Sequence, residues 1–236
     1  MNKKNKAIIA IGGTGGHVFP GCNLASHLNT KNYDVELVTD KRGRIYLKEF
    51  KVCKISNLPS SPLINKNIFT KSVSVIVIIY SIIRAIFFLL LNRPKVIFGM
   101  GGYASFPICI AASILKIDFI IYENNLIIGK ANKFLLPFAK KIIVSFKEVE
   151  GISNKYQNKI IEIGNIIKKE IINFPKKKEP LKKNGSNLNI LILGGSQAAK
   201  IFAEKLPHIF KLCSDQGIKF KIYQHCLPNQ NEALKL

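Results

Sequence analysis

The residues best suited to chemistry gather near the start of the chain, in the segment GGTGGH at residues 12–17. Glycines let backbone N–H groups approach an anion closely, and a helix that begins there adds the positive end of its dipole. Two well-known patterns fail: the dinucleotide fingerprint would need glycine where Val18 stands, and no GxxxxGK[ST] is present. The segment therefore predicts a phosphate or diphosphate site, and a tight strand-to-helix turn without a ligand stays open as the alternative.

Two more glycine turns follow predicted strands, GMGGY at 99–103 and GGSQ at 194–197. In open α/β sheets, ligands bind outside the carboxyl ends of the strands, so all three turns can line clefts on that edge. The first two turns fall in one predicted domain and the third in another. We therefore expect a diphosphate held between two facing domains.

The elements that must position these turns alternate between short apolar runs and longer helical stretches, which predicts βα units around a parallel sheet. Strands are expected at 7–11, 33–39, 52–58, 95–98, 118–122, 141–145, 160–163, 188–193 and 219–223. Helices are expected near 21–31, 106–116 and 130–139, and from the third glycine turn to about 215.

A lysine-rich stretch with two prolines at 168–183 interrupts this alternation and has the composition of a solvated connection. We therefore expect a Rossmann-like domain at 1–165, a basic linker at 166–187 and a second domain at 188–236. A doubly wound domain typically needs roughly 100 residues to bury a core. The second Rossmann-like domain is accordingly expected to be incomplete.

The apolar stretch at 73–91 has Arg84 as its only charge and nearly fits the length of a membrane span. A span would place the strands before it and after it on opposite sides of the membrane, whereas they are expected to share one sheet. A buried or interfacial helix fits better. An apolar face with basic residues nearby suits contact with an anionic membrane surface; the face is Ile83, Phe87, Phe88 and Leu91, and the basic residues are Lys71, Arg84 and Arg93.

The composition is strongly basic, with 36 Lys and Arg against 14 Asp and Glu and a net charge of +22. Such an excess favours anionic partners, although compositional drift towards Lys, Ile and Asn is the alternative. No RNA-binding signature or zinc finger accompanies the charge, so nucleic acid is not an expected partner. The five cysteines include no CxxC pair, and the run at 7–11 is too short for a signal peptide, so we expect a cytoplasmic location.

Five segments occur in the order and spacing seen in the MurG family: GGTGGHVFP at 12–20, GMGGYASFP at 99–107, YENNLIIGKANKFL at 122–135, GN at 164–165 and GGSQAAKIF at 194–202. The chain resembles this family of N-acetylglucosaminyltransferases over essentially its whole length. The resemblance implies a GT-B fold, with an acceptor domain first and a donor domain second. Family contacts to uracil and ribose come later than residue 236, so a C-terminally truncated member is expected.

The resemblance also implies an enzyme, an inverting hexosyltransferase that moves GlcNAc from UDP-GlcNAc to undecaprenyl-pyrophosphoryl-MurNAc-pentapeptide. It implies no metal or cofactor, a peripheral location on the cytoplasmic face of the inner membrane, and a part in peptidoglycan synthesis, cell shape and cell division. The alternative from a different class is a non-catalytic or half-enzyme subunit, membrane-associated and acceptor-binding, that needs a separate donor domain.

Individual roles are carried over from the family by motif. The implied donor contacts are Thr14, Gly15, Gly16, Asn125, Lys168 and Ser196. The implied acceptor pyrophosphate cradle is Gly12, Gly13, Gly101 and Gly102, with Tyr103 beside it.

The chemistry asks for a general base near the acceptor hydroxyl. His17 suits this role by type, and the alternative is an imidazole that only holds the glycine loop. Glu123 is the rival base, or else it orients Asn125 or Asn132. Two departures from the family motifs stand out: YENN at 122–125 replaces HEQN, and Lys168 stands where the family has a donor-contacting arginine, which keeps the charge but loses bidentate geometry.

Overall fold

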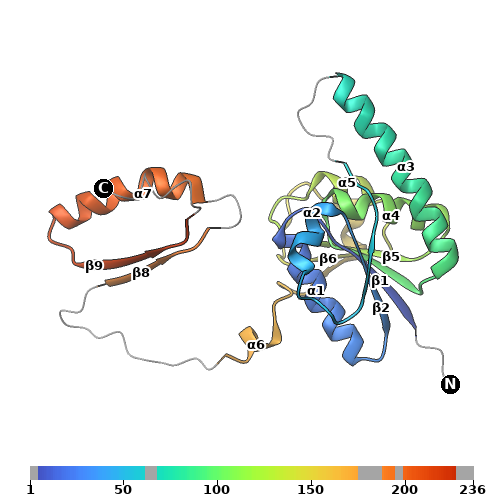
Figure 1. Ribbon diagram of the computed structural model, residues 1–236, viewed down its shortest axis with the longest axis horizontal. Coiled ribbons are helices and arrows are strands. Elements are labelled where there is room, and N and C mark those ends of the chain that lie inside the picture. Colours follow the sequence, from blue (N-terminus) through green and yellow to red (C-terminus); the bar gives the residue numbers. More distant parts are fainter. Residues whose placement is uncertain (1–4, 62–67, 175–187, 195–198, 227–236) are drawn as a thin grey trace. The chain divides into compact units, whose positions relative to one another are not determined.

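The computed structural model describes residues 5–61, 68–174, 188–194 and 199–226. Contacts divide the chain into two units, Met1–Phe174 and Pro175–Leu236, and each unit is described by itself (Figure 1). The predicted linker at 166–187 extends across this division, and its residues 175–187 lie outside the described ranges.

The first unit is built on a seven-stranded sheet with strand order β3-β2-β1-β4-β5-β6-β7. Neighbouring strands are parallel throughout. The strands are β1 Lys6–Ala10, β2 Asp34–Thr39, β3 Lys54–Asn57, β4 Val96–Gly99, β5 Phe119–Glu123, β6 Lys141–Val144 and β7 Ile160–Glu162. The helices of this unit are α1 Gly15–Thr30, α2 Lys41–Arg44, α3 Ile68–Asn92, α4 Gly102–Ile114, α5 Lys130–Leu135 and α6 Lys169–Ile172, with 3-10 turns η1 Ile45–Leu47 and η2 Asn154–Lys159.

Two apolar cores lie on the two faces of this sheet. Side chains alternate along a strand, so Ile8 of β1 joins one core and Ile9 joins the other. The first core packs residues of α3, α4 and α5 against the sheet, and the second packs residues of α1. Each fully buried aliphatic side chain contributes about 1.5–3 kcal/mol. Helices therefore cover both faces, as a parallel sheet requires.

The predicted α/β fold with a parallel sheet is confirmed, and each predicted strand has a counterpart within two residues. Two predicted helix starts are wrong, because α1 begins at Gly15 rather than near residue 21, and α4 begins at Gly102 rather than 106. Both helices contain a proline near their start, Pro20 and Pro107, which the sequence pattern presents as a helix boundary. The predicted helix at 130–139 ends earlier, at Leu135.

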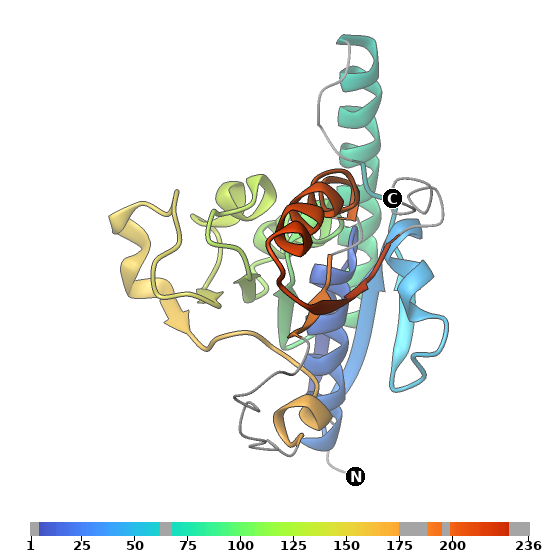
Figure 2. The same cartoon turned by 90° about the vertical axis from the view of Figure 1, so that its left-hand side faces the viewer.

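Helix α3 confirms the predicted helix at 73–91, for which a buried and an interfacial position were both expected (Figure 1). Ala85 and Leu89 are among its few buried residues, and 22% of the 18-residue apolar window is buried. Figure 2 shows the same helix projecting beyond the sheet. Phe88 is half-buried against the core, so its predicted place on the exposed face is wrong, whereas Ile83, Phe87 and Leu91 are exposed. Strand β1 precedes α3 in the sequence and β4 follows it. These two strands pair directly, which argues against α3 as a membrane span.

The described part of the second unit is one βαβ unit. Strands β8 Leu188–Ile192 and β9 Phe220–Gln224 pair in parallel, and α7 Ala199–Asp215 connects them. Phe210 of α7 packs on Phe220 of β9 with ring centroids 5.3 Å apart. This agrees with the second Rossmann-like element that the sequence predicted.

Candidate active site

The candidate site begins where the strand order of the first unit reverses direction. From β1 the chain proceeds through β2 to β3 on one side, and from β4 it proceeds through β5 to β7 on the other. The segments after β1 and β4 are the two predicted glycine loops, and they leave the same carboxyl edge of the sheet. This switch point is the usual ligand position in a doubly wound sheet.

The two glycine loops lie against each other at this edge. A Cβ placed on Gly102 would lie 3.4 Å from the Gly12 carbonyl oxygen and 3.2 Å from His17 Cδ2, and one on Gly101 would lie 3.0 Å from His17 Cε1. Gly101 and Gly102 also have positive φ angles of 90° and 72°. Side chains at these two positions would therefore be strained and would collide with the His17 imidazole.

The starts of α1 and α4 offer backbone donors. Thr14 is the N-cap of α1 but its side chain makes no capping hydrogen bond, and the N-cap of α4 is Gly101. The first N–H groups of a helix have no partner within the helix, so a phosphate can accept from them. Gly13 has φ +80° and no described atom within 4 Å of an added Cβ, which leaves room for a ligand beside it.

His17 is the side chain that these loops enclose. Its Nδ1 is buried and has no described partner that meets hydrogen-bond geometry. Burial lowers the pKa of His17 below its ordinary value, while the Glu123 carboxylate and the Met100 backbone oppose this shift without reversing it. The imidazole is therefore neutral at pH 7 and able to accept a proton, as a general base must.

Glu123 ends β5 close to His17 and is fully engaged by amide donors. Its Oε1 accepts from the Asn125 backbone N at 3.1 Å and from Asn125 Nδ2 at 2.7 Å. Its Oε2 accepts from the Gly129 N at 2.9 Å and from Asn132 Nδ2 at 3.0 Å. These bonds occupy about all the acceptor sites of a carboxylate. They fit the alternative that Glu123 orients Asn125 and Asn132, and its role as a base stays a prediction.

Asn124 connects the loop after β5 to the first glycine loop. Pro20 lacks an N–H group, so the carbonyl of Gly16, four residues earlier in α1, has no donor from the helix. Asn124 Nδ2 supplies that donor at 2.9 Å. The Asn124 Oδ1 is buried and has no hydrogen-bond partner among the described residues. Pro20, which resembles a helix break in the sequence, thus leaves the Gly16 carbonyl free to accept from Asn124. This bond connects the loop after β5 to the glycine loop after β1.

Tyr122, at a position where the resembled family has histidine, ties the segment at 164–166 to the sheet. Its hydroxyl lies 2.7 Å from Ser145 Oγ and accepts from the Ile166 N at 3.3 Å. Asn23 Nδ2 of α1 donates to the Ile166 carbonyl at 3.3 Å. Lys168 follows directly as the N-cap of α6, so this lysine is anchored beside α1.

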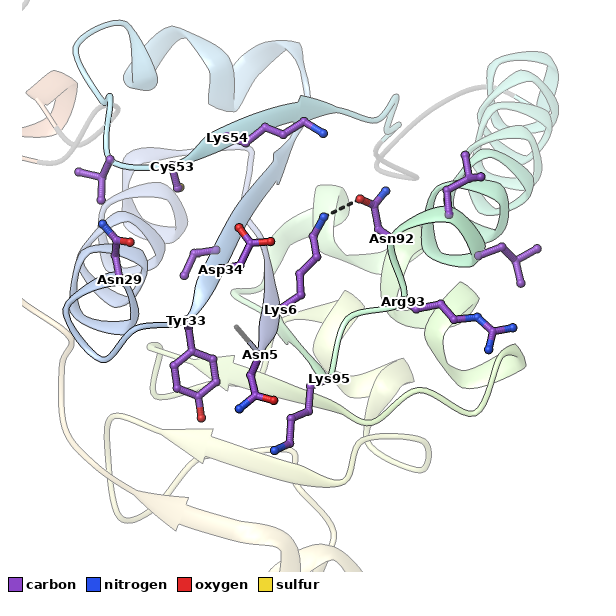
Figure 3. Close-up of a pocket in the computed structure, with 14 residues that line it drawn as sticks. Asn5, Lys6, Asn29, Tyr33, Asp34, Cys53, Lys54, Asn92, Arg93 and Lys95 are labelled. Atoms are coloured by element: carbon purple, nitrogen blue, oxygen red, sulfur yellow. Dashed lines mark hydrogen bonds between the residues drawn. The ribbon is translucent and has the colours of Figure 1, made fainter. Parts of the chain in front are cut away.

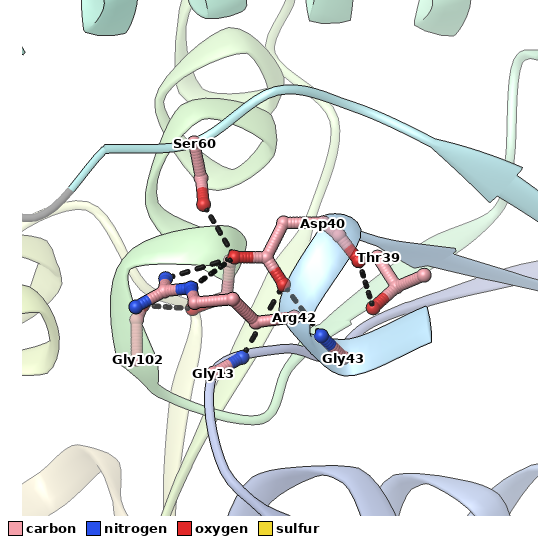
Figure 4. A network of polar contacts seen from close by, with 8 residues as sticks. Gly13, Thr39, Asp40, Arg42, Gly43, Ser60 and Gly102 are labelled. Atoms are coloured by element: carbon pink, nitrogen blue, oxygen red, sulfur yellow. Dashed lines mark hydrogen bonds and ion pairs between the residues drawn. The ribbon is translucent and has the colours of Figure 1, made fainter. Parts of the chain in front are cut away.

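A second carboxylate at the carboxyl edge is absent from the sequence-based predictions. Asp40 follows β2, is buried, and accepts from the Gly43 N at 2.9 Å and from Ser60 Oγ at 2.8 Å (Figure 4). Arg42 Nη2 forms an ion pair with it at 2.8 Å. The signal that would have found it is an acidic residue directly after a predicted strand at the edge that carries the glycine loops.

The remaining predicted residues are distributed as follows. Tyr103 is the half-buried second residue of α4, and Asn125 is exposed apart from its bonds to Glu123. Ser196, in the third glycine turn, lies outside the described residues. In the described ranges no three His, Cys, Asp or Glu side chains lie together as metal ligands would.

A spacious hollow lies at the opposite edge of the sheet. It measures about 990 Å³ and is lined by residues at the amino ends of β1 to β4 and the end of α3, including Lys6, Lys54, Arg93 and Lys95 (Figure 3). None of the glycine loops lines it. Glu36 is buried next to this hollow and pairs with Lys6 at 2.8 Å and Lys54 at 3.3 Å. We place the chemistry at the loops, because Lys6 and Lys54 of this hollow are already engaged by Glu36.

The chain is similar in sequence to relatives of known name. The chain is 35% identical over its full length to "UDP-N-acetylglucosamine--N-acetylmuramyl-(pentapeptide) pyrophosphoryl-undecaprenol N-acetylglucosamine transferase" of Pelagibacter ubique, and covers 63% of that protein. It is 34% identical over 92% of its length to the protein of the same name from Rickettsia canadensis, of which it covers 60%. The chain thus spans less than two thirds of the length of these curated relatives.

Solved structures show the same fold. MurG of Acinetobacter baumannii matches 98% of the chain at 24% identity with a TM-score of 0.70, and 61% of that protein is covered. The UDP-GlcNAc 2-epimerase of Neisseria meningitidis, solved with UDP-GlcNAc bound, matches 98% of the chain at 15% identity with a TM-score of 0.56, and 68% of it is covered. These likenesses confirm the predicted GT-B type of fold.

The sequence matches the glycosyltransferase family 28 N-terminal domain over residues 7–144, which contain β1 to β6 and both glycine loops of the first unit. The chain therefore belongs to glycosyltransferase family 28.

Proposed function

We propose that this chain belongs to an inverting N-acetylglucosaminyltransferase that moves GlcNAc from UDP-GlcNAc to undecaprenyl-pyrophosphoryl-MurNAc-pentapeptide, in peptidoglycan synthesis. The single observation that carries the proposal is the meeting of two glycine loops around His17 at the β1/β4 switch point. The names of the curated relatives supply the substrates. In this proposal residues 1–165 bind the acceptor, 166–187 are a basic linker, and 188–236 contribute to the donor side.

The acceptor diphosphate is proposed to lie on the backbone donors of the two loops, at Gly12, Gly13, Gly101 and Gly102, with Tyr103 beside them. The helix-start N–H groups of α1 and α4 favour an anion there, although the Gly13 N–H is shared with Asp40 at 3.4 Å. The positive φ angles of three of these glycines allow the backbone to face the anion. The donor is proposed to contact Thr14, Gly15 and Gly16, with Asn125, Lys168 and Ser196.

His17 is proposed as the general base. Its neutral imidazole would accept the proton of the acceptor 4-hydroxyl while that oxygen bonds to C1 of GlcNAc, and the C1–O bond to UDP would break with inversion. Glu123, with its four amide donors, supports this assignment as a carboxylate that stabilises the imidazolium and orders the loop. It remains the rival base if His17 proves dispensable.

The exposed face of α3 is proposed to rest on the cytoplasmic surface of the inner membrane, where the lipid acceptor lies. Ile76, Ile79, Ile83 and Phe87 are each about half exposed or more, which is unusual for large apolar side chains on one helix. The excess of Lys and Arg over Asp and Glu favours an anionic surface.

The experiment that tests the function titrates the full chain with a short-chain analogue of the lipid acceptor, followed by calorimetry, and then adds radiolabelled UDP-GlcNAc. We expect saturable acceptor binding for which inorganic pyrophosphate competes. His17→Ala should leave that binding within a few-fold. Wherever transfer is measurable, the same variant should lower its rate by about 10²–10⁴-fold, the usual contribution of a general base. A chain that binds no acceptor, or binds it without competition from pyrophosphate, contradicts the proposal.

A further inference from the structure

Arg42 places a permanent positive charge beside the glycine loops. Its Nε and Nη2 lie 2.9 and 2.8 Å from Asp40 Oδ2, and Asp40 Oδ1 lies 3.4 Å from the Gly13 N of the first glycine loop (Figure 4). The Arg42 side chain is nevertheless 46% exposed. A guanidinium has five N–H donors, so the two nitrogens engaged by Asp40 leave its outer edge able to donate to another acceptor.

Asp40 fixes both Arg42 and the first glycine loop. Its Oδ1 accepts from the Gly43 N at 2.9 Å and lies 3.4 Å from the Gly13 N, while its Oδ2 accepts from Ser60 Oγ. A Cβ on Gly12 would come within 2.9 Å of the same Oδ1. Burial acts to raise the pKa of Asp40, but hydrogen bonds from Gly43, Ser60 and Arg42 outweigh it and hold the pKa below its ordinary value.

The electrostatics of this edge call for such a cation. A diphosphate brought to the loops would approach two buried carboxylates, Asp40 and Glu123, and a His17 imidazole that is neutral at pH 7. Helix starts supply only partial positive charges. The planar guanidinium matches phosphate oxygens in a bidentate manner and stays charged at any working pH, which is why arginine is common at such sites.

We propose that Arg42, positioned by Asp40, binds the diphosphate of the acceptor at the two glycine loops. Asp40 acts as a positioning residue, because its oxygens are engaged by Gly43, Ser60 and Arg42 and so hold the guanidinium in place. The inference rests on the proposed function, since it takes the carboxyl edge as the diphosphate site.

The test titrates the full chain with geranyl diphosphate and with inorganic pyrophosphate by calorimetry. Arg42→Ala should weaken both by about 10–100-fold, the worth of a charge-assisted hydrogen bond. Arg42→Lys should lose less, because the charge remains. Arg44→Ala is the matched control: it removes the same charge from the same short helix, where Arg44 makes only a 3.5 Å contact with the Ile55 carbonyl, and should change affinity less than twofold. Thermal unfolding of each variant verifies the fold.

Asp40→Asn tests the positioning role through a double-mutant cycle. If Asp40 acts through Arg42 as well as through the loop, Asp40→Asn should cost less affinity when added to Arg42→Ala than it costs in the unsubstituted chain, whereas independent effects would add. Equal affinities of Arg42→Ala and Arg44→Ala would overturn the inference while the proposed diphosphate site stands. Failure of the unsubstituted chain to bind either diphosphate would instead overturn the proposed site and this inference together.

Discussion

The two edges of the parallel sheet differ in how their polar groups are satisfied. At the amino edge the charges close on one another, since Lys6 and Lys54 both pair with the buried Glu36. At the carboxyl edge, buried polar atoms without a described hydrogen-bond partner remain on His17, Asn124 and Asn132, and no ion pair is described for these atoms. At the amino edge Glu36 Oε2 also lacks a described hydrogen bond, but it forms the ion pair with Lys6. The amino edge nevertheless holds a hollow of about 990 Å³. We therefore base the candidate site on unpaired donors and acceptors and not on the volume of a cavity.

The largest effect expected from the comparison is at Gly12, where the carboxyl edge is most tightly packed. An added Cβ would lie 2.2 Å from Ala104 Cβ, so Gly12→Ala should lower the free energy of unfolding by about 3 kcal/mol, at the upper end for overpacking. Gly13→Ala is the matched control: it has no described neighbour within 4 Å and should cost about 1 kcal/mol through its positive φ alone. Equal unfolding midpoints in urea for the two variants would mean that the loop is not packed as described.

Glu36→Gln should separate stability from ligand binding. The variant leaves two lysines without their carboxylate, and we expect a loss of about 2 kcal/mol in the free energy of unfolding. Burial acts to raise the pKa of Glu36, but Lys6, Ser56 and Lys54 outweigh it and hold the pKa below its ordinary value. The stabilisation is therefore present above about pH 4.5 and is lost as the pH falls through the lower folded-state pKa.

The variant should accordingly show a flatter loss of stability in acid than the unsubstituted chain, while its affinity for geranyl diphosphate stays unchanged. A loss of diphosphate affinity in Glu36→Gln, with the fold intact, would indicate that the anion binds at the amino edge. It would contradict the proposed difference between the two edges.

Phe87→Ser tests whether the exposed face of α3 contacts a membrane. The last turns of this helix border the hollow at the amino edge. Phe87 is 64% exposed, so its loss should leave the unfolding midpoint nearly unchanged. Binding to vesicles that contain anionic lipid should weaken roughly tenfold, since part of an aromatic side chain no longer enters the bilayer. Ala85→Ser, at a buried position of the same helix, should instead cost stability and spare vesicle binding. The opposite pattern would rule out the exposed face as the membrane contact.

The smallest expected effect is a pH dependence from His17. Because burial lowers its folded-state pKa, the unfolded chain binds more protons below about pH 6.5, and stability is lost as the pH falls from there towards the folded-state pKa. His17→Asn should flatten this part of the stability curve, whereas His27→Asn, at an exposed position, should leave it in place. A curve that is the same in all three proteins would show that His17 is not buried by the loops.

The strands and their parallel arrangement could be predicted, because apolar runs of four to seven residues separated by helical stretches have few other solutions. The two glycine loops could be placed at the carboxyl edge for the same reason. The starts of α1 and α4 could not be predicted, since Pro20 and Pro107 resemble helix boundaries. At Pro20 the missing helix hydrogen bond is replaced by a bond from Asn124, more than 100 residues away in the sequence. Such compensation depends on tertiary contacts that a local pattern does not contain.

The glycine loops of the site could be predicted from the sequence, but the roles of its side chains could be predicted only in part. His17 and Glu123 were named from their motifs, yet the choice between a base and an anchoring group depends on hydrogen bonds that spacing does not reveal. Asp40 and Arg42 were missed because a DxR triplet after a strand is common in turns. Their meeting with Gly13 arises from the adjacency of β1 and β2 in the sheet.

Amide NMR spectra of the labelled chain during a titration with geranyl diphosphate would show whether the diphosphate lies at the carboxyl edge. We expect the backbone amides of Gly13, Gly15, Gly16 and Gly102 to shift first and to saturate together. Shifts that instead begin at Lys6, Lys54 and Lys95, with the glycine amides unmoved, would place the anion in the opposite hollow and contradict the account.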